Sequence, residues 1–339
     1  MIRWIKRIAA VLGCIIIVAL LAGVAYEQIM RRQAAEQFPP PGRLVDVGGH
    51  RMQIDCRGSG SPTVVLEAGL DALGSLSWSA VHDAIAKHGR ACAYSRAGLV
   101  WSEPRSEKFQ PDGVARDLHG LLANAGEHPP FVMVGHSLGG PYIMTFTRLY
   151  PQDVAGLVFV DASHPDQIER IKEAIGKSLS SGDGLLKVAV ALSWTGVPRI
   201  FASRSEASGM PAHVKAVQDA YISRSAGALL DEADSLESTL SSAGQLRELG
   251  ERPIVVLTAV KPFPETALKA MQLTVAQGQE IQRVWKQMHD DEASWSHHSR
   301  REIVADSSHY IQFDRPDVVI AAVSDVVDQV RSAGTVPRQ

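Results

Sequence analysis

The sequence predicts an α/β fold with a mostly parallel, doubly wound sheet, which is a sheet covered by helices on both faces. Two observations support this prediction. Strand-like and helix-like segments alternate along the chain from residue 43, and several strand-like segments, such as "TVVLEAG" and "VAGLVFVD", are apolar without interruption. Such strands are buried on both faces, as is typical of parallel sheets between layers of helices. A chain of 339 residues, 45% of them hydrophobic, can hold one such domain.

The first half of the predicted sheet begins with a hairpin. It turns at Gly48 and Gly49, because glycines between two alternating segments are a hairpin signal. Strands and helices then alternate, and Gly89 and Gly126 each mark the end of a helix. The strands are expected at 63–69, 91–95, 130–135 and 154–161, and the helices at 77–89, 113–126 and 139–150.

A largely helical insertion, residues 165–250, interrupts the alternation and divides the α/β core into 43–164 and 251–335. The second part of the core is expected to hold strands at 252–259 and 299–306, a helical stretch between them, and a last helix with Pro316 in its first turn. Insertions of this size commonly form lids over a site. We expect Trp194, Met210 and Tyr221 either to line an apolar pocket or to form a small core of the insertion itself.

The first 32 residues form a separate unit. Residues 8–25 carry no charge and are flanked by basic residues on both sides, and their length reaches that of a membrane-spanning helix. We expect an uncleaved signal anchor with a cytoplasmic N-terminus and an extracytoplasmic catalytic domain. A cleaved signal peptide, with a site at Ala25 that would release a secreted protein, stays open. Residues 33–42 are polar and then proline-rich, which is typical of a linker.

The net charge, and the lack of metal-binding and phosphate-binding motifs, argue against several kinds of ligand and partner. The net charge is −3, and beyond residue 32 acidic residues outnumber basic ones by 36 to 29, which argues against a nucleic-acid partner. The cysteines and histidines lack the spacing of a zinc site. The glycine-rich residues 58–62 lack the lysine of a phosphate-binding loop. We therefore expect neither a metal nor a cofactor.

The stretch "FVMVGHSLGG" carries the strongest functional signal. Residues 135–139 match G-x-S-x-G at a turn from a strand to a helix, which is the context that gives this motif its meaning. Such a turn is tight and strained, so the positions two residues before and after Ser137 have no room for a side chain. Gly135 and Gly139 meet this requirement. The turn exposes the Ser137 hydroxyl as a nucleophile and directs the backbone N–H of Leu138 towards an oxyanion beside it.

A serine nucleophile needs a base to accept its proton, and His309 is the best candidate. It follows the last predicted strand and precedes the last helix, in "ADSSHYIQFDRPDVV". His136 lies within the serine turn, where its ring should point away from the hydroxyl. His297 and His298 precede the last strand and so lie at the opposite end of the sheet.

Residues 43–330 resemble the α/β-hydrolase superfamily, in its branch of esterases and peptidase-like enzymes with a serine nucleophile. The segments "VVLEAG", "AYSRAGLVWSEP", "VMVGHSLGG", "LVFVDASHP" and "SSHYIQFDRPDVV" match this superfamily in type and order. Three positions depart from its pattern. Ala68 stands in place of the usual histidine, Ser95 in place of the usual aspartate, and Val100 in place of a glycine.

The resemblance also implies the remaining members of the site. The second oxyanion donor should be the backbone N–H of Leu70. The acid that orients His309 usually follows the strand at 252–259, where Glu265 is the first carboxylate. In some members it follows the preceding strand instead, where Asp161 lies at the carboxyl end. We favour Asp161, because a residue at a strand end points into the site with little loop freedom, and Glu265 stays open.

The implied activity is hydrolysis of a small ester, or of an amide, through an acyl-enzyme and without a cofactor. A cofactor-free, haloperoxidase-like perhydrolase and a non-catalytic binding protein with this fold are the alternatives. In this fold the strands that carry Cys56 and Cys92 are antiparallel neighbours. We expect a disulfide between the two in an exported domain, and two free thiols remain the alternative.

Overall fold

A computed structural model describes residues 2–179, 183–197, 199 and 210–335. Its strands form one eight-stranded sheet in the order β1-β2-β4-β3-β5-β6-β7-β8. The β1–β2 and β2–β4 pairs are antiparallel, and all the other pairs are parallel. The predicted mostly parallel sheet is therefore confirmed. The strands are β1 (Arg43–Asp46), β2 (Arg51–Arg57), β3 (Thr63–Glu67), β4 (Arg90–Tyr94), β5 (Phe131–His136), β6 (Val154–Val160), β7 (Ile254–Ala259) and β8 (Ser299–Val304).

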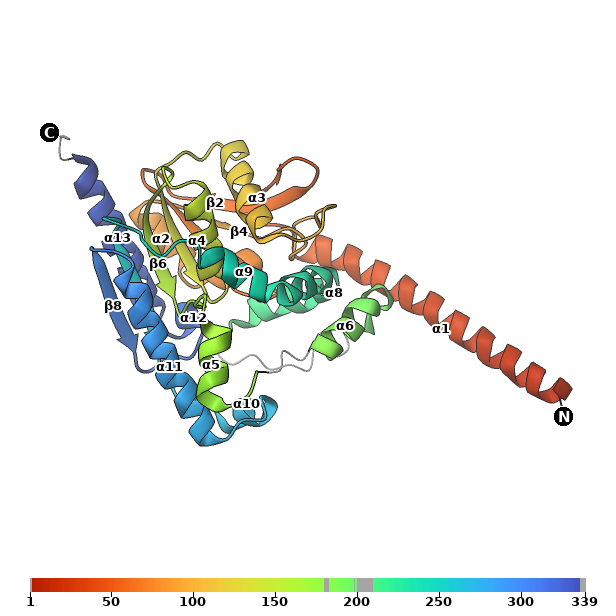
Figure 1. Cartoon of the computed structure of the whole chain (residues 1–339). Coiled ribbons are helices and arrows are strands. Elements are labelled where there is room, and N and C mark those ends of the chain that lie inside the picture. The colour runs from red at the N-terminus through yellow and green to blue at the C-terminus, as the bar shows by residue number, and fades with distance from the viewer. Residues whose placement is uncertain (1, 180–182, 198, 200–209, 336–339) are drawn as a thin grey trace.

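Helices cover both faces of this sheet (Figure 1). Successive residues of a strand point to opposite faces, so Val64 and Leu66 of β3 pack in one core cluster and Val65 packs in the other. This explains why the central strands are apolar at every position. One face is covered by η1 (Gly74–Trp78), α2 (His82–His88), α12 (Ile311–Asp314) and α13 (Pro316–Thr335), and the other by α3 (Pro111–Asn124), α4 (Gly139–Leu149) and α9 (Leu236–Ala243).

The predicted insertion contains α5 (Gln167–Ile175), α6 (Asp183–Ala191), η2 (Ser193–Thr195), α8 (Ala212–Asp234) and α9. Its last helix belongs to the core rather than to a lid. α9 packs against α3 and α4, and Ala243 and Leu249 join the larger core cluster. α5 packs against α11 (Val275–Ser294), which covers β7 and β8 beside α10 (Glu265–Ala270). The part of the insertion that stands away from the sheet layers therefore runs only from α6 to α8.

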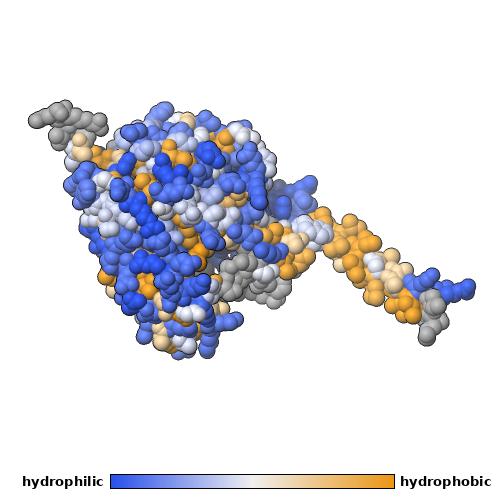
Figure 2. All heavy atoms as spheres, viewed as in Figure 1, coloured by the Kyte–Doolittle hydropathy of each residue, from blue (hydrophilic) through white to orange (hydrophobic). Residues whose placement is uncertain are grey.

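A single helix, α1 (Ile2–Gln37), replaces both the predicted 32-residue anchor and the start of the predicted linker. Residues 33–37 favour a helix, and the first proline follows only at Pro39, so the helix continues past Arg32. The first part of α1 extends away from the body with its apolar side chains exposed (Figures 1 and 2). By length and composition this part of α1 can cross a membrane.

Two aromatic residues of the insertion differ in their surroundings. Tyr221 on α8 is buried against Leu99, Trp101 and Ala34, so it belongs to a small core between the insertion and α1. Trp194 in η2 is 45% exposed.

The expected disulfide is present. Cys56 on β2 and Cys92 on β4 are direct partners in the antiparallel register, and their sulfur atoms are bonded. The remaining cysteine, Cys14 on α1, is exposed.

Removing this disulfide should destabilise the protein. The bond closes a loop of 36 residues, and a bond across such a loop typically contributes about 2–4 kcal/mol to the free energy of unfolding. We expect the Cys56→Ala/Cys92→Ala variant to unfold in urea at a lower midpoint than the oxidised wild type. Cys14→Ser is the matched control. Identical urea midpoints for the double variant and the wild type would contradict this expectation.

Candidate active site

The serine motif forms the predicted sharp turn between β5 and α4. Ser137 has a left-handed backbone (φ 53°), which a residue with a side chain adopts only under strain. An added Cβ at Gly135 would lie 2.6 Å from the carbonyl of Gly139, and one at Gly139 would collide with the backbone of Glu67. Only glycine fits at these two positions, so they permit the turn that carries Ser137.

Asp161 and His309 form a hydrogen-bonded pair beside this turn. Asp161 directly follows β6, and its Oδ2 lies 2.6 Å from Nδ1 of His309. Its Oδ1 accepts two further hydrogen bonds, from the backbone N–H of Ala259 and from Nε1–H of Trp285, both at 3.0 Å. Both oxygens of this buried carboxylate are therefore held in place.

The surroundings of Asp161 favour its charged form. Burial alone would raise the pKa of this carboxyl, but the hydrogen bond and charge of His309 outweigh burial, and the N–H of Ala259 adds to them. The pKa of Asp161 is lowered as a result. An ionised carboxylate on Nδ1 leaves Nε2 as the ring nitrogen of His309 that can accept a proton.

Backbone contacts hold Ser137 close to Asp161. The N–H of Ser137 donates to the carbonyl of Val160 at 3.3 Å, and the carbonyl of Ser137 accepts from the N–H of Ser163 at 2.8 Å. The serine turn is thus bonded to residues on both sides of Asp161. The structure brings the predicted nucleophile, base and acid to neighbouring positions at the carboxyl ends of β5, β6 and β8.

His136 fixes the loop that carries His309, a role that its place in the motif does not reveal. Its Nε2 lies 2.9 Å from the carbonyl oxygen of His309, and the two rings are 4.7 Å apart. Burial is the main reason that the pKa of His136 falls to about 3. A neutral ring can donate from Nε2 to this carbonyl, so His136 tethers the loop without adding charge.

The two expected oxyanion donors flank Ser137. An added Cβ at Gly69 would lie 2.9 Å from Cβ of Ser137, so the loop after β3 passes directly against the serine. Leu70 follows in this loop, and Leu138 follows the serine. Within the described part of the chain, the backbone N–H of neither leucine donates to another residue. Both N–H groups are therefore free for a ligand.

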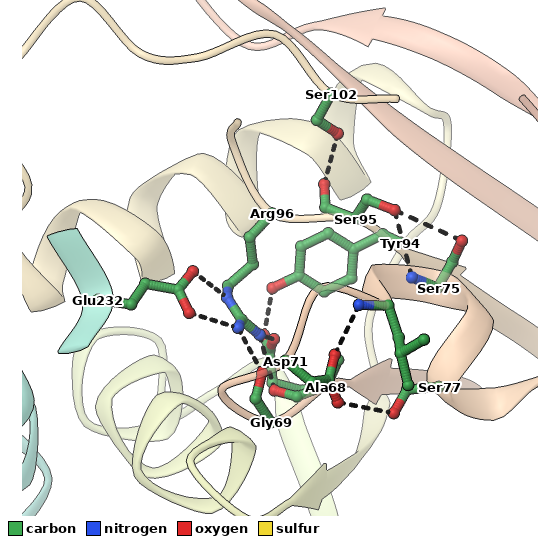
Figure 3. A network of polar contacts seen from close by, with 12 residues as sticks. Ala68, Gly69, Asp71, Ser75, Ser77, Tyr94, Ser95, Arg96, Ser102 and Glu232 are labelled. Atoms are coloured by element: carbon green, nitrogen blue, oxygen red, sulfur yellow. Dashed lines mark hydrogen bonds and ion pairs between the residues drawn. The ribbon is translucent and has the colours of Figure 1, made fainter. Parts of the chain in front are cut away.

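A buried arginine holds the loop that carries Leu70 (Figure 3). Nη1 of Arg96 donates to Glu67 and to the carbonyl of Ala68, both at 2.7 Å, and Nη2 donates to the carbonyl of Gly69 at 2.6 Å. Glu232, on α8 of the insertion, binds the same guanidinium through both of its oxygens at 2.9 and 2.7 Å. The loop of the expected oxyanion donor is thus connected to the insertion.

Two departures from the superfamily pattern have a structural explanation. Ser95 donates to Gln53 at 2.8 Å and accepts the N–H of Ser75 at 3.2 Å, so a hydroxyl serves where the superfamily usually has a carboxylate. Val100 has the left-handed backbone that a glycine provides (φ 47°), and its N–H donates to Ser225 at 2.9 Å. Valine is strained in this conformation, which glycine would adopt freely, and the hydrogen bond to Ser225 helps to hold it.

Glu265, the alternative candidate for the acid, does not contact His309. Glu265 is the first residue of α10 and is exposed, and it makes no hydrogen bond or ion pair with His309. The structure therefore pairs His309 with Asp161 and leaves Glu265 apart.

Among the residues that the structure describes, two groups have the spacing of metal ligands, and neither fits a metal well. In the first, Cys56 and Cys92 are consumed by the disulfide. The second comprises His164, Asp166 and Asp291, where Arg247 lies 2.6 Å from Asp166 and 3.8 Å from Asp291. Arg247 and Arg170, which lies 3.8 Å from Asp291, already supply the positive charge that balances these two carboxylates.

The sequence profile of the alpha/beta hydrolase family matches residues 54–322, which is well over half of the chain. The chain belongs to this alpha/beta hydrolase family. The superfamily expected from the motifs is therefore confirmed.

The curated relatives that match this chain are distant in sequence. An AB hydrolase superfamily protein from Gibberella zeae is 26% identical over 297 residues, which cover 80% of this chain and 87% of the relative. The uncharacterized protein YbdG from Bacillus subtilis is 23% identical over 164 residues, which cover 48% of this chain and 50% of the relative. The chain spans at most half the length of the first curated relatives that it matches.

Solved structures share the fold. A probable hydrolytic enzyme from Pseudomonas aeruginosa superimposes with a TM-score of 0.64 at 20% identity, over 86% of this chain and 95% of that one. An esterase from Thermogutta terrifontis gives a TM-score of 0.57 at 19% identity, over 83% of this chain and 94% of that one. An epoxide hydrolase from Bacillus megaterium gives a TM-score of 0.58 at 14% identity, over 84% of this chain and 100% of that one. These similarities establish the fold alone.

Proposed function

We propose that this alpha/beta hydrolase is a serine esterase in which Ser137 is the nucleophile, His309 the base and Asp161 the acid. The observation that carries the proposal is the 2.6 Å contact between Asp161 and Nδ1 of His309 beside the strained serine turn. Epoxide hydrolases among the structural neighbours do not change this assignment, because the turn carries a serine and not the aspartate nucleophile of that chemistry.

The reaction proceeds in two steps. Nε2 of His309 accepts the proton of Ser137 while Oγ attacks the ester carbonyl, and the N–H groups of Leu138 and Leu70 bind the oxyanion. The imidazolium, which is stabilised by Asp161, returns the proton to the leaving alcohol, and an acyl-enzyme remains. Water then attacks the acyl group with the same base, which releases the acid and restores Ser137.

The substrate class is a small, neutral or moderately apolar ester, and amides are the second candidate. The test measures hydrolysis of p-nitrophenyl esters of increasing acyl length beside aminoacyl anilides, together with labelling of Ser137 by an organophosphonate. We expect stoichiometric labelling and faster cleavage of esters than of anilides. Faster anilide cleavage would indicate a peptidase. Perhydrolysis of acetate by peroxide that exceeds ester hydrolysis would indicate the haloperoxidase-like activity.

A folded protein that neither reacts with the phosphonate nor cleaves any ester would be a binding protein and would overturn the proposal. Circular dichroism of the same sample shows whether the protein is folded.

We also infer that α1 anchors the hydrolase in a membrane, with its catalytic domain on the extracytoplasmic side. The exposed apolar residues of α1 and its basic N-terminal flank support this inference. The mass of the protein purified from membranes tests it. An anchored chain retains residues 1–25, whereas a chain that begins at Tyr26 would show that a signal peptide has been removed.

The ion pair between Glu232 and Arg96 should influence turnover. Glu232→Gln weakens the hold of Arg96 on the carbonyls of Ala68 and Gly69, and this displaces the N–H of Leu70 from the oxyanion. We expect kcat to fall roughly tenfold or more with little change in KM, because loss of a well-placed oxyanion donor costs about 10²–10³ in rate.

Asp231→Asn is the matched control, since Asp231 is the exposed neighbour of Glu232 on the same helix. Affinity for a trifluoromethyl ketone, which mimics the tetrahedral adduct, should fall in parallel with kcat/KM. A Glu232→Gln variant with a lowered melting temperature but unchanged kcat and ketone affinity would show that the pair serves stability alone.

A further inference from the structure

The insertion presents an exposed apolar surface beside the membrane helix. We define the cap surface as Val188 and Ala191 of α6 together with Trp194 of η2. Val188 is 54% exposed, Trp194 is 45% exposed, and Ala191 is exposed as well. Nε1–H of Trp194 donates to the carbonyl of Ala191 at 2.8 Å, so the indole ring can enter an apolar medium without losing a hydrogen bond to water.

η2 lies directly against α1. An added Cβ at Gly23 would lie 3.0 Å from the carbonyl oxygen of Thr195, and one at Gly196 would lie 2.7 Å from the ring of Tyr26. The two glycines thus let the two segments approach at the level of residues 23–26. The uncharged part of α1 ends at Tyr26, just before Glu27, so η2 lies where α1 would leave the hydrocarbon layer of a membrane.

A buried ion pair fixes this arrangement. Glu27 on α1 binds Arg199 of the insertion through both oxygens, at 2.7 and 3.1 Å, and both side chains are less than 8% exposed. Arg31 also donates to Glu27 at 2.7 Å. Since separating the partners would leave a buried charge unpaired, α1 and the insertion are held as one unit.

The shape of the molecule suits a membrane at this level. Figure 1 shows α6 lying crosswise to α1, between the projecting part of α1 and the body of the hydrolase. Figure 2 shows apolar residues near the base of this projection. A membrane surface that crosses α1 near Ala25 would therefore run along α6 and leave the body in water. Trp194 and Tyr26 would then lie at the boundary between lipid and water, which is where tryptophan and tyrosine are enriched in membrane proteins.

We propose that the cap surface rests in the headgroup layer of the lipid bilayer that α1 crosses. The binding partner is lipid, which covers Val188, Ala191 and Trp194 in the way that it covers the apolar face of an interfacial helix. This proposal rests on the membrane anchoring inferred above. The membrane would thus contact the hydrolase at two places, and the insertion would have a fixed orientation to the bilayer.

A depth-sensitive probe tests the proposal in the full chain. In a Cys14→Ser background that retains the disulfide, Trp194→Cys and Val188→Cys are labelled with a polarity-sensitive nitrobenzoxadiazole dye. The protein is reconstituted in phosphatidylcholine–phosphatidylglycerol vesicles that contain headgroup spin-labelled lipid. We expect a blue-shifted emission and strong quenching at both positions, relative to the same protein in detergent.

The matched control is Ser59→Cys. Ser59 is exposed in a loop whose neighbour Gly60 lies near Arg331 at the end of α13, and Figure 1 shows that end on the opposite side of the molecule from the projecting part of α1. This position should show no quenching by lipid. Equal quenching at positions 194 and 59 would overturn the proposal.

Two further results are also informative. Ile16→Cys on α1 reports the anchor independently of the cap. Quenching at position 16 by spin labels at the bilayer centre, without quenching at position 194, would retain the anchor and reject the cap contact. Absence of quenching at both positions would reject both. A probe at position 194 that is equally shielded in detergent and in vesicles would mean that protein, from this chain or from a second copy, covers the surface, and this would also overturn the proposal.

Discussion

Replacing Ser137 by alanine is expected to lower kcat on p-nitrophenyl esters by about four to six orders of magnitude while the protein stays folded. The proposed acyl-enzyme cannot form without Oγ, and the residual rate comes from the oxyanion donors and substrate binding alone. Loss of the hydroxyl removes little from the core, because the turn is held by backbone contacts to Val160 and Ser163. Kinetics on the ester panel and circular dichroism measure the two quantities.

The matched control for this substitution is Ser223→Ala. Ser223 is buried on α8, and its hydroxyl has no hydrogen-bond partner among the described residues. Its removal should leave both activity and folding unchanged. A Ser137→Ala protein that keeps more than about 1% of wild-type kcat would contradict the proposed nucleophile, because loss of a nucleophilic serine typically costs far more than this. Continued phosphonate labelling of that variant would point to another residue.

Replacing Asp161 by asparagine should lower kcat by about 10⁴-fold, which is the typical cost of presenting the wrong histidine tautomer. The structure explains why the tautomer changes. The N–H groups of Ala259 and Trp285 both point at Oδ1, so an asparagine would place its amide oxygen there. Its NH₂ group would then face Nδ1 of His309 and force the proton onto Nε2. A ring that is protonated at Nε2 cannot accept the proton of Ser137.

Glu265→Gln is the comparison for Asp161→Asn. Glu265 is exposed at the start of α10, and its replacement should change kcat less than about twofold, since surface substitutions away from a site have small effects. The two variants are compared on the same ester, and urea denaturation shows whether Asp161→Asn remains folded. If Glu265→Gln loses turnover and Asp161→Asn does not, Glu265 completes the triad and the present assignment is wrong.

The sheet and the serine turn could be predicted because they depend on local patterns. Continuous apolar runs indicate strands that are buried on both faces, and glycines on both sides of Ser137 indicate a turn that excludes side chains. Asp161 could be proposed from its place at the end of a strand. The choice between Asp161 and Glu265 as the partner of His309 stayed open, because 148 residues separate Asp161 from His309 and only the order of the strands brings the two together.

Other features of the structure could not be predicted, because no local pattern in the sequence indicates them. Glu232 reaches Arg96 across 136 residues, and the spacing of the two carries no motif. α9 was assigned to the insertion because helical periodicity shows that a helix has an apolar face but not which element covers that face. The predicted linker was too long for a similar reason. Residues 33–37, three of which are polar, look like a spacer in sequence, yet they continue α1, and Ala34 is buried against the insertion.

The Glu27–Arg199 ion pair affects how this protein can be produced for biochemistry. A water-soluble version is best made by deleting the chain up to Ala25, so that Glu27 and the last turns of α1 remain attached to the body. Deletion through Gln37 also removes the predicted membrane segment, but it takes Glu27 away from the Arg199 guanidinium and uncovers the apolar contacts of Tyr221. Loss of an ion pair together with newly exposed apolar surface favours aggregation on expression.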